Sequence, residues 1–297
     1  MTASLTVIVP AVNEPLDVQK TLEALARERA ATGVEAIVVS RLGAPVAGLV
    51  RSSFPWAQVM DVPHGTTIPA MRALAFERVT TPWVAVIEDH VAVPAGWVKL
   101  MTERAQETGA VVGGPVDNLA TTTLLDRAAF LCEYSHCMPP LGGGVTSWLP
   151  GNNVVYPSAT ARRYVEMLRR GSWENDMHEA IKAEGGSLVM VPEGVVGHDK
   201  HYSLWEYVSQ RYLYSRSFAG KRSQQSSAVK RLAYAAGSLA LPPVLLMRIV
   251  SRVGARSEHR GTLLRSLPLI ATFVLSWAAG ELVGYLAGPG DSLGKVR

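Results

Sequence analysis

The sequence has little cysteine and no glycine-rich loop after its first predicted strand, and each absence excludes a class of protein. Its only cysteines, Cys132 and Cys137, provide neither a disulfide framework nor the paired spacing of a zinc ribbon. We therefore expect reduced thiols in a cytosolic protein. The apolar run Leu5–Val9 continues directly into Pro10. This argues against P-loop NTPases, Rossmann dehydrogenases and sugar nucleotidylyltransferases, which need a phosphate-binding loop there.

Charged residues are also scarce. They make up 18% of the 297 residues, whereas hydrophobic residues make up 48%, and the formal net charge is +4. This composition favours a protein that works at a membrane surface. The N-terminus lacks the basic and then apolar order of a signal peptide. We expect a protein of the cell membrane whose catalytic part lies on the cytoplasmic side.

Strands alternate with helices along the first third of the chain. The predicted strands are Leu5–Val9, Ala36–Ser40, Gln58–Val62 and Val84–Ile87. Apolar residues at helical spacing follow the first strand, and Ile68–Val79 is typical of a helix. This alternation predicts an α/β fold with a doubly wound, mostly parallel central sheet.

The middle of the chain is less regular. A further strand is predicted at 110–116 and a helix at 159–170. Between them, residues 118–149 form an irregular region, and Gly142–Gly144 in it predicts a mobile loop that closes over a ligand.

Glu88, Asp89 and His90 directly follow the strand Val84–Ile87. Parallel sheets bind ligands at the carboxyl ends of their strands, so these side chains are placed where chemistry usually occurs. Carboxylates and neutral imidazole are ligands for a divalent cation, which would hold a substrate phosphate. The alternative is a solvated turn at a strand end.

A later predicted helix starts with Ser172-Trp173-Glu174-Asn175-Asp176, ends at Gly185-Gly186 and has an acid on its inward face. Glu174, Met177, His178 and Ile181 share one side at offsets of three and four residues, whereas Asp176 points away. Glu174 is therefore the first candidate for a buried general base and Asp176 the second. The alternative is an acid that only complements the helix dipole.

Six motifs in order, over roughly residues 4–220, resemble the family 2 glycosyltransferases, which are inverting enzymes with the GT-A nucleotide-sugar fold. The motifs are the first strand with Asn13-Glu14, Glu88-Asp89-His90 followed by Pro94-Ala-Gly-Trp97, Pro150-Gly-Asn152-Asn153, Trp173-Glu174 with Gly186 twelve residues after the glutamate, Val191-Pro-Glu193 with His198, and Gln210–Arg216.

The resemblance implies metal-assisted transfer of a sugar from a nucleotide-diphosphate donor to a hydroxyl acceptor, with inversion. Glu174 is then the base, and Asp89 and His90, with His198 as a third candidate, hold Mn²⁺ or Mg²⁺. The implied nucleotide-sugar-binding residues are Pro10, Asn13, Glu14, Arg72, Glu88, Asp89, Arg211 and Arg216. The implied acceptor and sugar pocket consists of Gly151, Asn152, Asn153, Trp173 and Tyr212.

Two departures from the family pattern concern specificity. The second strand ends in Ser40-Arg41-Leu42-Gly43 where the family usually has Asp-Asp-Gly-Ser, so the nucleobase stays open. His90 occupies the third position of the Asp-x-Asp motif. Because imidazole is softer than carboxylate, His90 favours manganese over magnesium.

From residue 221 onward the chain becomes basic and apolar, which predicts a catalytic domain at 1–220 and a helical membrane-associating region at 221–297. Arginines recur every four residues from Arg248 to Arg260 and favour anionic membrane lipids as partners, with a solvated face as the alternative. Nucleic acid is disfavoured because interleaved aromatic residues are lacking. We predict an interfacial or re-entrant helix at 232–247 and a candidate transmembrane helix at 267–287, with a soluble helical hairpin as the alternative.

These observations predict a membrane-associated, inverting hexosyltransferase that acts on a lipid-linked or polysaccharide acceptor in cell-envelope polysaccharide biosynthesis. Two alternatives stay open: a sugar-1-phosphate nucleotidylyltransferase, and a non-catalytic, membrane-recruited nucleotide-sugar-binding module. The sugar, the acceptor and the oligomeric state are not fixed by the sequence.

Overall fold

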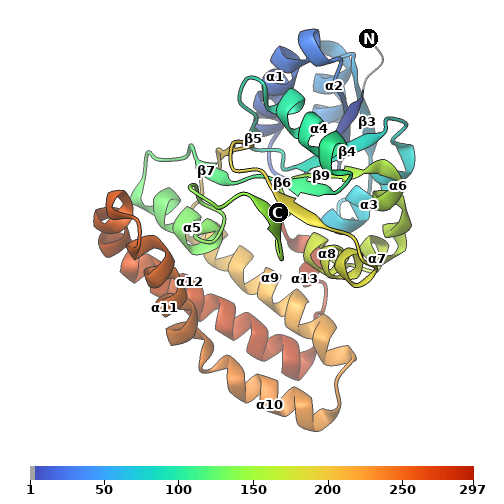
Figure 1. The fold of residues 1–297 in the computed structure, drawn as a ribbon. Coiled ribbons are helices and arrows are strands. Elements are labelled where there is room, and N and C mark those ends of the chain that lie inside the picture. The colour runs from blue at the N-terminus through green and yellow to red at the C-terminus, as the bar shows by residue number, and fades with distance from the viewer. Residues whose placement is uncertain (1–3) are drawn as a thin grey trace. The chain divides into compact units, whose positions relative to one another are not determined.

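The computed structural model describes residues 4–297, which form two compact units (Figure 1). Unit 1 contains the described residues up to Asp117 together with Cys137–Asp199, and unit 2 contains Asn118–His136 and Lys200–Arg297. The boundary predicted at residue 220 falls within helix α9, Leu204–Gln224. The predicted boundary separates a catalytic domain from a membrane-associating region, and it stays a prediction.

Unit 1 is built on an eight-stranded mixed sheet in the order β3-β2-β1-β4-β9-β6-β10-β8. Its strands are β1 Leu5–Ala11, β2 Glu35–Ser40, β3 Ala57–Asp61, β4 Trp83–Ile87, β6 Val111–Gly113, β8 Gly144–Thr146, β9 Asn153–Pro157 and β10 Leu188–Met190. The first four strands pair in parallel, as their uninterrupted apolar runs predict. β9 lies antiparallel between β4 and β6. The predicted α/β fold with a large, mostly parallel central sheet is confirmed.

The helices of unit 1 are α1 Pro15–Thr32, α2 Ala44–Ser53, α3 Ile68–Arg78, α4 Trp97–Thr108, α6 Ser158–Arg163, α7 Val165–Arg169 and α8 Glu174–Ala183. The start of α4 shows why the sequence folds this way. Gly96 adopts a φ of 84°, and the backbone N–H groups of Gly96 and Val98 donate to the buried Glu28 carboxylate on α1. These bonds satisfy helix-terminal donors that would otherwise lack partners.

A three-stranded sheet in the order β5-β11-β7 joins distant segments, with β5 Val91–Ala92, β7 Val116–Asn118 and β11 Val196–His198. The antiparallel register of β5 and β11 sets His198 opposite Val91. A histidine more than a hundred residues away in the chain is thereby delivered beside His90.

Three local predictions were wrong. The strand predicted at 110–116 is split into β6 and β7 at Gly114 and Pro115, because proline has no backbone N–H to donate within a sheet. The helix predicted at 159–170 is interrupted at Tyr164, whose φ is −106°. The region predicted as irregular contains helix α5, Leu124–Tyr134, which Thr123 caps by accepting the N–H of Asp126.

Unit 2 is helical and consists of α5, α9, α10 Ala228–Ser238, α11 Leu241–Gly254, the short 3₁₀ helix η1 Ser257–His259, α12 Arg260–Ala287 and α13 Ser292–Lys295. α9 and α12 run side by side (Figure 1). Their backbones approach closely because small residues lie at the crossing: a side chain added at Gly280 would be 2.3 Å from the Tyr212 carbonyl oxygen.

One segment of the described chain, Ser257–Ala287, is long and apolar enough to cross a membrane. In addition, α10 and α11 meet at an angle of 56°, the geometry of a broken span or a re-entrant loop. The bend lies where the sequence places Pro242 and Pro243, which open α11. These features are weak evidence for membrane association.

Candidate functional site

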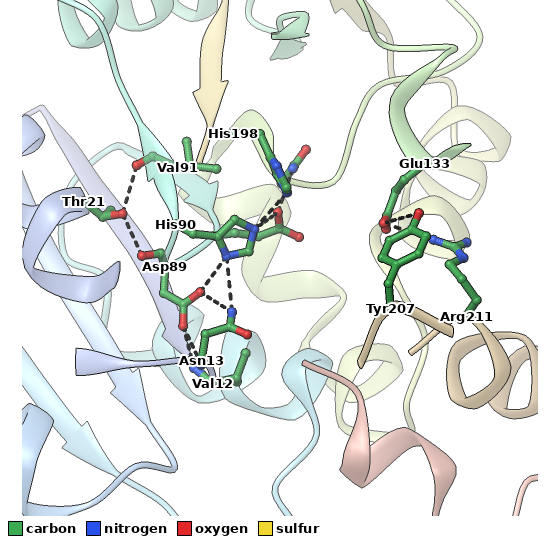
Figure 2. A network of polar contacts seen from close by, with 12 residues as sticks. Val12, Asn13, Thr21, Asp89, His90, Val91, Glu133, His198, Tyr207 and Arg211 are labelled. Carbon is green, nitrogen blue, oxygen red and sulfur yellow. Dashed lines mark hydrogen bonds and ion pairs between the residues drawn. The ribbon is translucent and has the colours of Figure 1, made fainter. Parts of the chain in front are cut away.

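Asp89 connects the carboxyl end of β4 to the segment after β1 through hydrogen bonds. Its Oδ2 accepts the backbone N–H groups of Val12 and Asn13 at 2.7 and 2.9 Å, and its Oδ1 accepts the Asn13 side-chain amide at 2.7 Å (Figure 2). The residue is fully buried. Burial alone would raise the pKa of Asp89, but hydrogen bonds from His90 and Asn13 outweigh it and lower that pKa. Both carboxylate oxygens are therefore engaged in holding the loop after β1.

His90 turns from the same strand end toward β11. Its Nδ1 donates to Asp89 Oδ1 at 2.9 Å, and its Nε2 lies 3.0 Å from Nε2 of His198 and 3.4 Å from Oε2 of Glu88 (Figure 2). Burial opposes the charged form of His90, but the hydrogen bonds to Asp89 and Glu88 raise its pKa to about 10. His90 is therefore held as a cation between two acids.

Glu88, His90 and His198 form a candidate metal cluster. One ligand atom from each lies within 4.8 Å of the others. Two atoms bound at about 2.1 Å to one ion lie roughly 3 to 3.5 Å apart. The distances of 3.0 and 3.4 Å from His90 Nε2 to His198 and Glu88 are of this size. One carboxylate and two imidazoles suit manganese or zinc better than magnesium. Any ion bound there would displace the His90 proton.

The cluster differs from the predicted ligand set in one member. His90 and His198 are brought together as predicted, but the third candidate ligand beside them is Glu88, whereas Asp89 contacts the other ring nitrogen of His90. Glu88 also accepts the Asn152 side-chain amide at 2.8 Å. Burial would raise the pKa of Glu88, but the hydrogen bond and charge of His90 outweigh it and lower that pKa. Glu88 is thus a carboxylate at neutral pH.

Glu174 is buried at the first position of α8, where it forms an ion pair with Arg72 of α3. Both side chains are at most 4% exposed. Burial disfavours the charge of Arg72, but the negative charges of Glu174 and Glu88 raise its pKa. The Arg72 guanidinium also lies 6.0 Å from the ring centre of Trp173. Glu174, Met177, His178 and Ile181 form the buried face of α8, as predicted, whereas Asp176 is exposed.

The ion pair leaves one acceptor and one donor without partners. Within residues 4–297, Oε1 of Glu174 and Nε of Arg72 are buried and make no hydrogen bond. Buried polar atoms of this kind are uncommon in folded proteins, because each costs about 1–3 kcal/mol. An unsatisfied carboxylate oxygen beside an unsatisfied guanidinium N–H is an arrangement that a polar ligand would complete.

The turn Gly151–Asn152 connects the two acidic groups. Asn152 binds Glu88, and a side chain added to Gly151 would lie 3.1 Å from Oε2 of Glu174. Consecutive Cα atoms are only about 3.8 Å apart, so one dipeptide contacts both acids. Glu88 and Glu174 therefore lie beside neighbouring residues of the same turn.

The remaining predicted residues of unit 1 lie in different surroundings. Asn153 is fully buried, donates to the carbonyls of Pro115 and Gly194, and accepts the Trp97 indole N–H at 3.2 Å. Pro10 is a buried residue of β1, and Glu14 is exposed at the start of α1. These contacts give Asn153 a structural function in joining three segments.

Three predicted residues belong to unit 2 and make contacts there. Arg211 forms an ion pair with Glu133 at 3.1 Å (Figure 2). Arg216 donates to the Gly288 carbonyl, and the Tyr212 backbone packs on Gly280. Each of these three residues therefore has partners within unit 2.

Thr21 is a site residue that sequence reasoning missed. Its hydroxyl lies 2.8 Å from the carbonyl oxygen of Asp89 and 3.0 Å from that of Val91, so it positions the backbone on both sides of His90 (Figure 2). The available signal was a polar residue beside Val18, Leu22 and Leu25 on the buried face of α1.

Residues 6–146 match the family model described as glycosyl transferase family 2. This segment of the chain is similar to glycosyl transferase family 2. The family 2 segment includes Glu88, Asp89 and His90 and ends before Gly151, Glu174 and His198. The match supports a glycosyltransferase, and the family implies a nucleotide-sugar donor and an acceptor.

The solved structure of residues 1–349 of S. aureus TarS has a similar fold, with a TM-score of 0.51 over 94% of this chain and 90% of that chain. At 10% sequence identity this likeness shows the fold alone, which is GT-A-like with additional C-terminal helices. No curated protein matches the chain by sequence.

Proposed function

We propose that the chain is an inverting glycosyltransferase that moves a sugar from a nucleoside-diphosphate donor to a hydroxyl of a lipid-linked or polysaccharide acceptor. The observation that carries the proposal is the turn Gly151–Asn152, which contacts Glu174 through one residue and Glu88 through the next. A base for the acceptor and ligands for a diphosphate-binding cation are thereby joined in one site.

Glu174 is the proposed general base. Its Oε1 lacks a hydrogen-bond donor within the described chain, and an acceptor hydroxyl is a donor. A hydroxyl bound at Oε1 would transfer its proton to the carboxylate as its oxygen attacks the anomeric carbon. A single displacement from the side opposite the leaving group inverts the configuration at the anomeric carbon. Such a reaction needs no second carboxylate to act as a nucleophile.

Arg72 holds this base in position. Its ion pair with Glu174 uses part of the guanidinium and leaves Nε to bind an oxygen of the substrate. The positive charge of Arg72 also lies near Glu88, so it contributes to stabilising a departing diphosphate. We assign this function to Arg72 rather than to Arg211 or Arg216, which have partners of their own in unit 2.

The proposed ligands of a divalent metal are Glu88, His90 and His198. This ligand set favours manganese over magnesium. When bound, the metal would supply positive charge against the diphosphate leaving group. Asp89 is proposed to position the loop at Asn13 rather than to bind the metal, because its oxygens accept three hydrogen bonds from Val12 and Asn13.

We also propose that unit 2 associates with a membrane. Large apolar side chains are exposed on its helices and the turn between α10 and α11, among them Leu232, Leu239, Met247, Leu264 and Leu275. Exposed arginines accompany them on α11 and α12. Apolar side chains bordered by cations suit the boundary between lipid chains and anionic headgroups.

The first test compares two acids on one turn of α8. Glu174→Gln should lower the release of nucleoside diphosphate by about 10²-fold or more, because a carboxamide cannot accept a proton. The matched control, Asp176→Asn, changes an exposed acid on the same turn and should leave the rate within about twofold of wild type.

The donor for this assay is the nucleotide sugar whose nucleoside diphosphate most raises the melting temperature in the presence of manganese. Equal rates for Glu174→Gln and wild type would contradict the proposed base. Release of pyrophosphate instead of nucleoside diphosphate would favour a nucleotidylyltransferase, and binding without any turnover would favour a non-catalytic module.

A further inference from the structure

Unit 2 contains a cavity that the proposed transfer reaction does not use. It encloses about 170 Å³ between α5, α9, α11 and α12. The residues that line it are of two kinds. Its apolar lining includes Leu245, Ile249, Phe273, Val274 and Trp277, and its charged lining consists of Glu133, Arg211, Arg248 and Arg252.

The cationic part of the cavity has an excess of positive charge. Glu133 is the only acid that lines it, and this acid is already paired with Arg211. Arg248 and Arg252 are exposed, and neither has an acidic partner within residues 4–297. They lie one turn apart on α11, so both guanidinium groups can reach one anion.

His136 does not relieve this positive potential. Burial, followed by the charges of Arg252 and Arg211, lowers the pKa of His136 to about 4. The imidazole is therefore neutral near pH 7. That both arginines act on His136 also indicates that their charges converge on the same cavity.

The apolar part continues from these arginines. Ile249 lies between Arg248 and Arg252 in sequence and turns inward, being 5% exposed, and Phe273 and Val274 of α12 are also buried. Arg211 closes one wall by lying 4.5 Å from the ring centre of Trp277. A ligand that satisfies both parts carries an anionic head and an apolar chain.

We propose that this cavity binds one molecule of a phosphate-headed lipid, with the phosphate at Arg248 and Arg252 and the chain against Leu245 and Ile249. Charge complementarity selects the head, because two unpaired guanidinium groups match the two negative charges of a phosphate monoester. Exposed apolar residues of α11, such as Met247 and Val250, place the cavity on the surface proposed to meet lipid. The inference concerns binding alone and does not depend on the transfer reaction.

The test measures binding to the full chain in a neutral detergent by melting temperature. Dihexanoyl phosphatidic acid should stabilise the protein saturably, whereas dihexanoyl phosphatidylcholine should not, and inorganic phosphate should bind at least tenfold more weakly. Arg248→Gln and Arg252→Gln should each raise the dissociation constant for phosphatidic acid about tenfold, through loss of a charged hydrogen bond.

Two variants make the test specific. Arg265→Gln removes an equally exposed arginine on α12 that does not line the cavity, and it should leave the dissociation constant unchanged. Leu245→Trp fills the apolar part and should weaken the binding of phosphatidic acid while leaving the binding of inorganic phosphate intact. If this variant fails to fold, the proposal is tested by the three arginine variants alone.

Several outcomes would overturn the proposal. Equal affinity for phosphate and phosphatidic acid would reveal an anion site only, and equal affinity for phosphatidylcholine would reveal an apolar site only. An equal loss in Arg265→Gln would reduce the effect to general surface charge. Absence of any saturable stabilisation would remove the site altogether.

Discussion

At the residue scale, three consecutive side chains after β4 lie in different surroundings, which supports the different tasks proposed for them. Glu88 and His90 face His198, whereas Asp89 turns inward to the backbone of Val12 and Asn13. A sequence motif read as a unit would give all three one function. Since each can be replaced singly, the division of tasks is testable.

Metal binding should therefore depend on Glu88 and His198 more than on Asp89. We expect Glu88→Gln and His198→Ala to weaken manganese binding by at least about tenfold, because each removes one of three ligands. Titration with manganese followed by electron paramagnetic resonance would measure it.

Asp89→Asn provides the comparison. Its amide would present an N–H to the donors at Val12 and Asn13, so we expect a loss of stability of about 1–3 kcal/mol with weaker effects on manganese. If Asp89→Asn weakened manganese binding more than Glu88→Gln did, the result would favour the ligand set predicted from the sequence, which includes Asp89.

His178 should make unit 1 sensitive to acid. It lies on the buried face of α8, and its Nε2 is 2.8 Å from the hydroxyl of Tyr156, which donates to it. Burial, followed by the charge of Lys182, lowers the pKa of His178 to about 4. A base whose folded pKa lies below its unfolded value near 6.5 is fully stabilising above pH 6.5 and loses that contribution as the pH falls toward 4.

We expect this one group to cost about 2 kcal/mol of unfolding free energy between pH 8 and pH 5. Urea unfolding of wild type and His178→Gln at both values measures it, because glutamine can still accept the Tyr156 hydrogen bond but does not titrate. Equal pH dependence in the two proteins would contradict the assignment.

At the element scale, the first four strands and their parallel arrangement were predictable, whereas the pairing of later segments was not. The carboxyl end of β4 follows from the apolar run Val84–Ile87. The pairing of β11 with β5, which brings His198 to His90, depends on a register between segments more than a hundred residues apart. Periodicity within a segment carries no information about such a register.

The same reason explains which site contacts were missed. The inward face of α8 followed from helical spacing, so Glu174 could be selected over Asp176. That Arg72 would be the partner of Glu174 could not be read from spacing, because the two lie on different helices. Helix α5 was missed because its start depends on the cap at Thr123 rather than on a long apolar stripe.

The crossing of α9 and α12 should tolerate no side chain at Gly280. A methyl group there would lie 2.0 Å from the Ser215 hydroxyl and 2.3 Å from the Tyr212 carbonyl, so the helices must separate. We expect Gly280→Ala to destabilise the protein by about 1–3 kcal/mol.

The control is Gly261→Ala on the same helix, where a methyl group meets no atom within 4 Å. Helix propensity predicts a small gain there, of at most about 1 kcal/mol. Thermal unfolding of both variants distinguishes the two positions. Similar melting temperatures would show that α9 and α12 do not pack in this way.

At the scale of the whole molecule, the membrane association proposed for unit 2 can take two forms: unit 2 lies on a membrane or crosses it. In the most apolar window of Ser257–Ala287, 39% of the residues are buried. Yet α9 packs along α12 and carries Arg211, Arg216 and Lys221. A span would take these charges into hydrocarbon, which is costly.

We therefore expect attachment at the interface. High salt alone should leave the protein on the membrane, because apolar side chains contribute to binding, whereas alkaline carbonate should release it. Sedimentation of the membrane fraction after each wash measures this. Retention after alkaline carbonate would identify α12 as a transmembrane helix.

The turn Gly151–Asn152 links the surroundings of two acids through a single peptide unit. Asn152 gives up its hydrogen bond if Glu88 turns to another partner, and the adjacent Gly151 lies beside Glu174. Under the proposed function, occupancy at Glu88 would therefore be felt at Glu174 through the backbone between neighbouring residues rather than through a long chain of contacts.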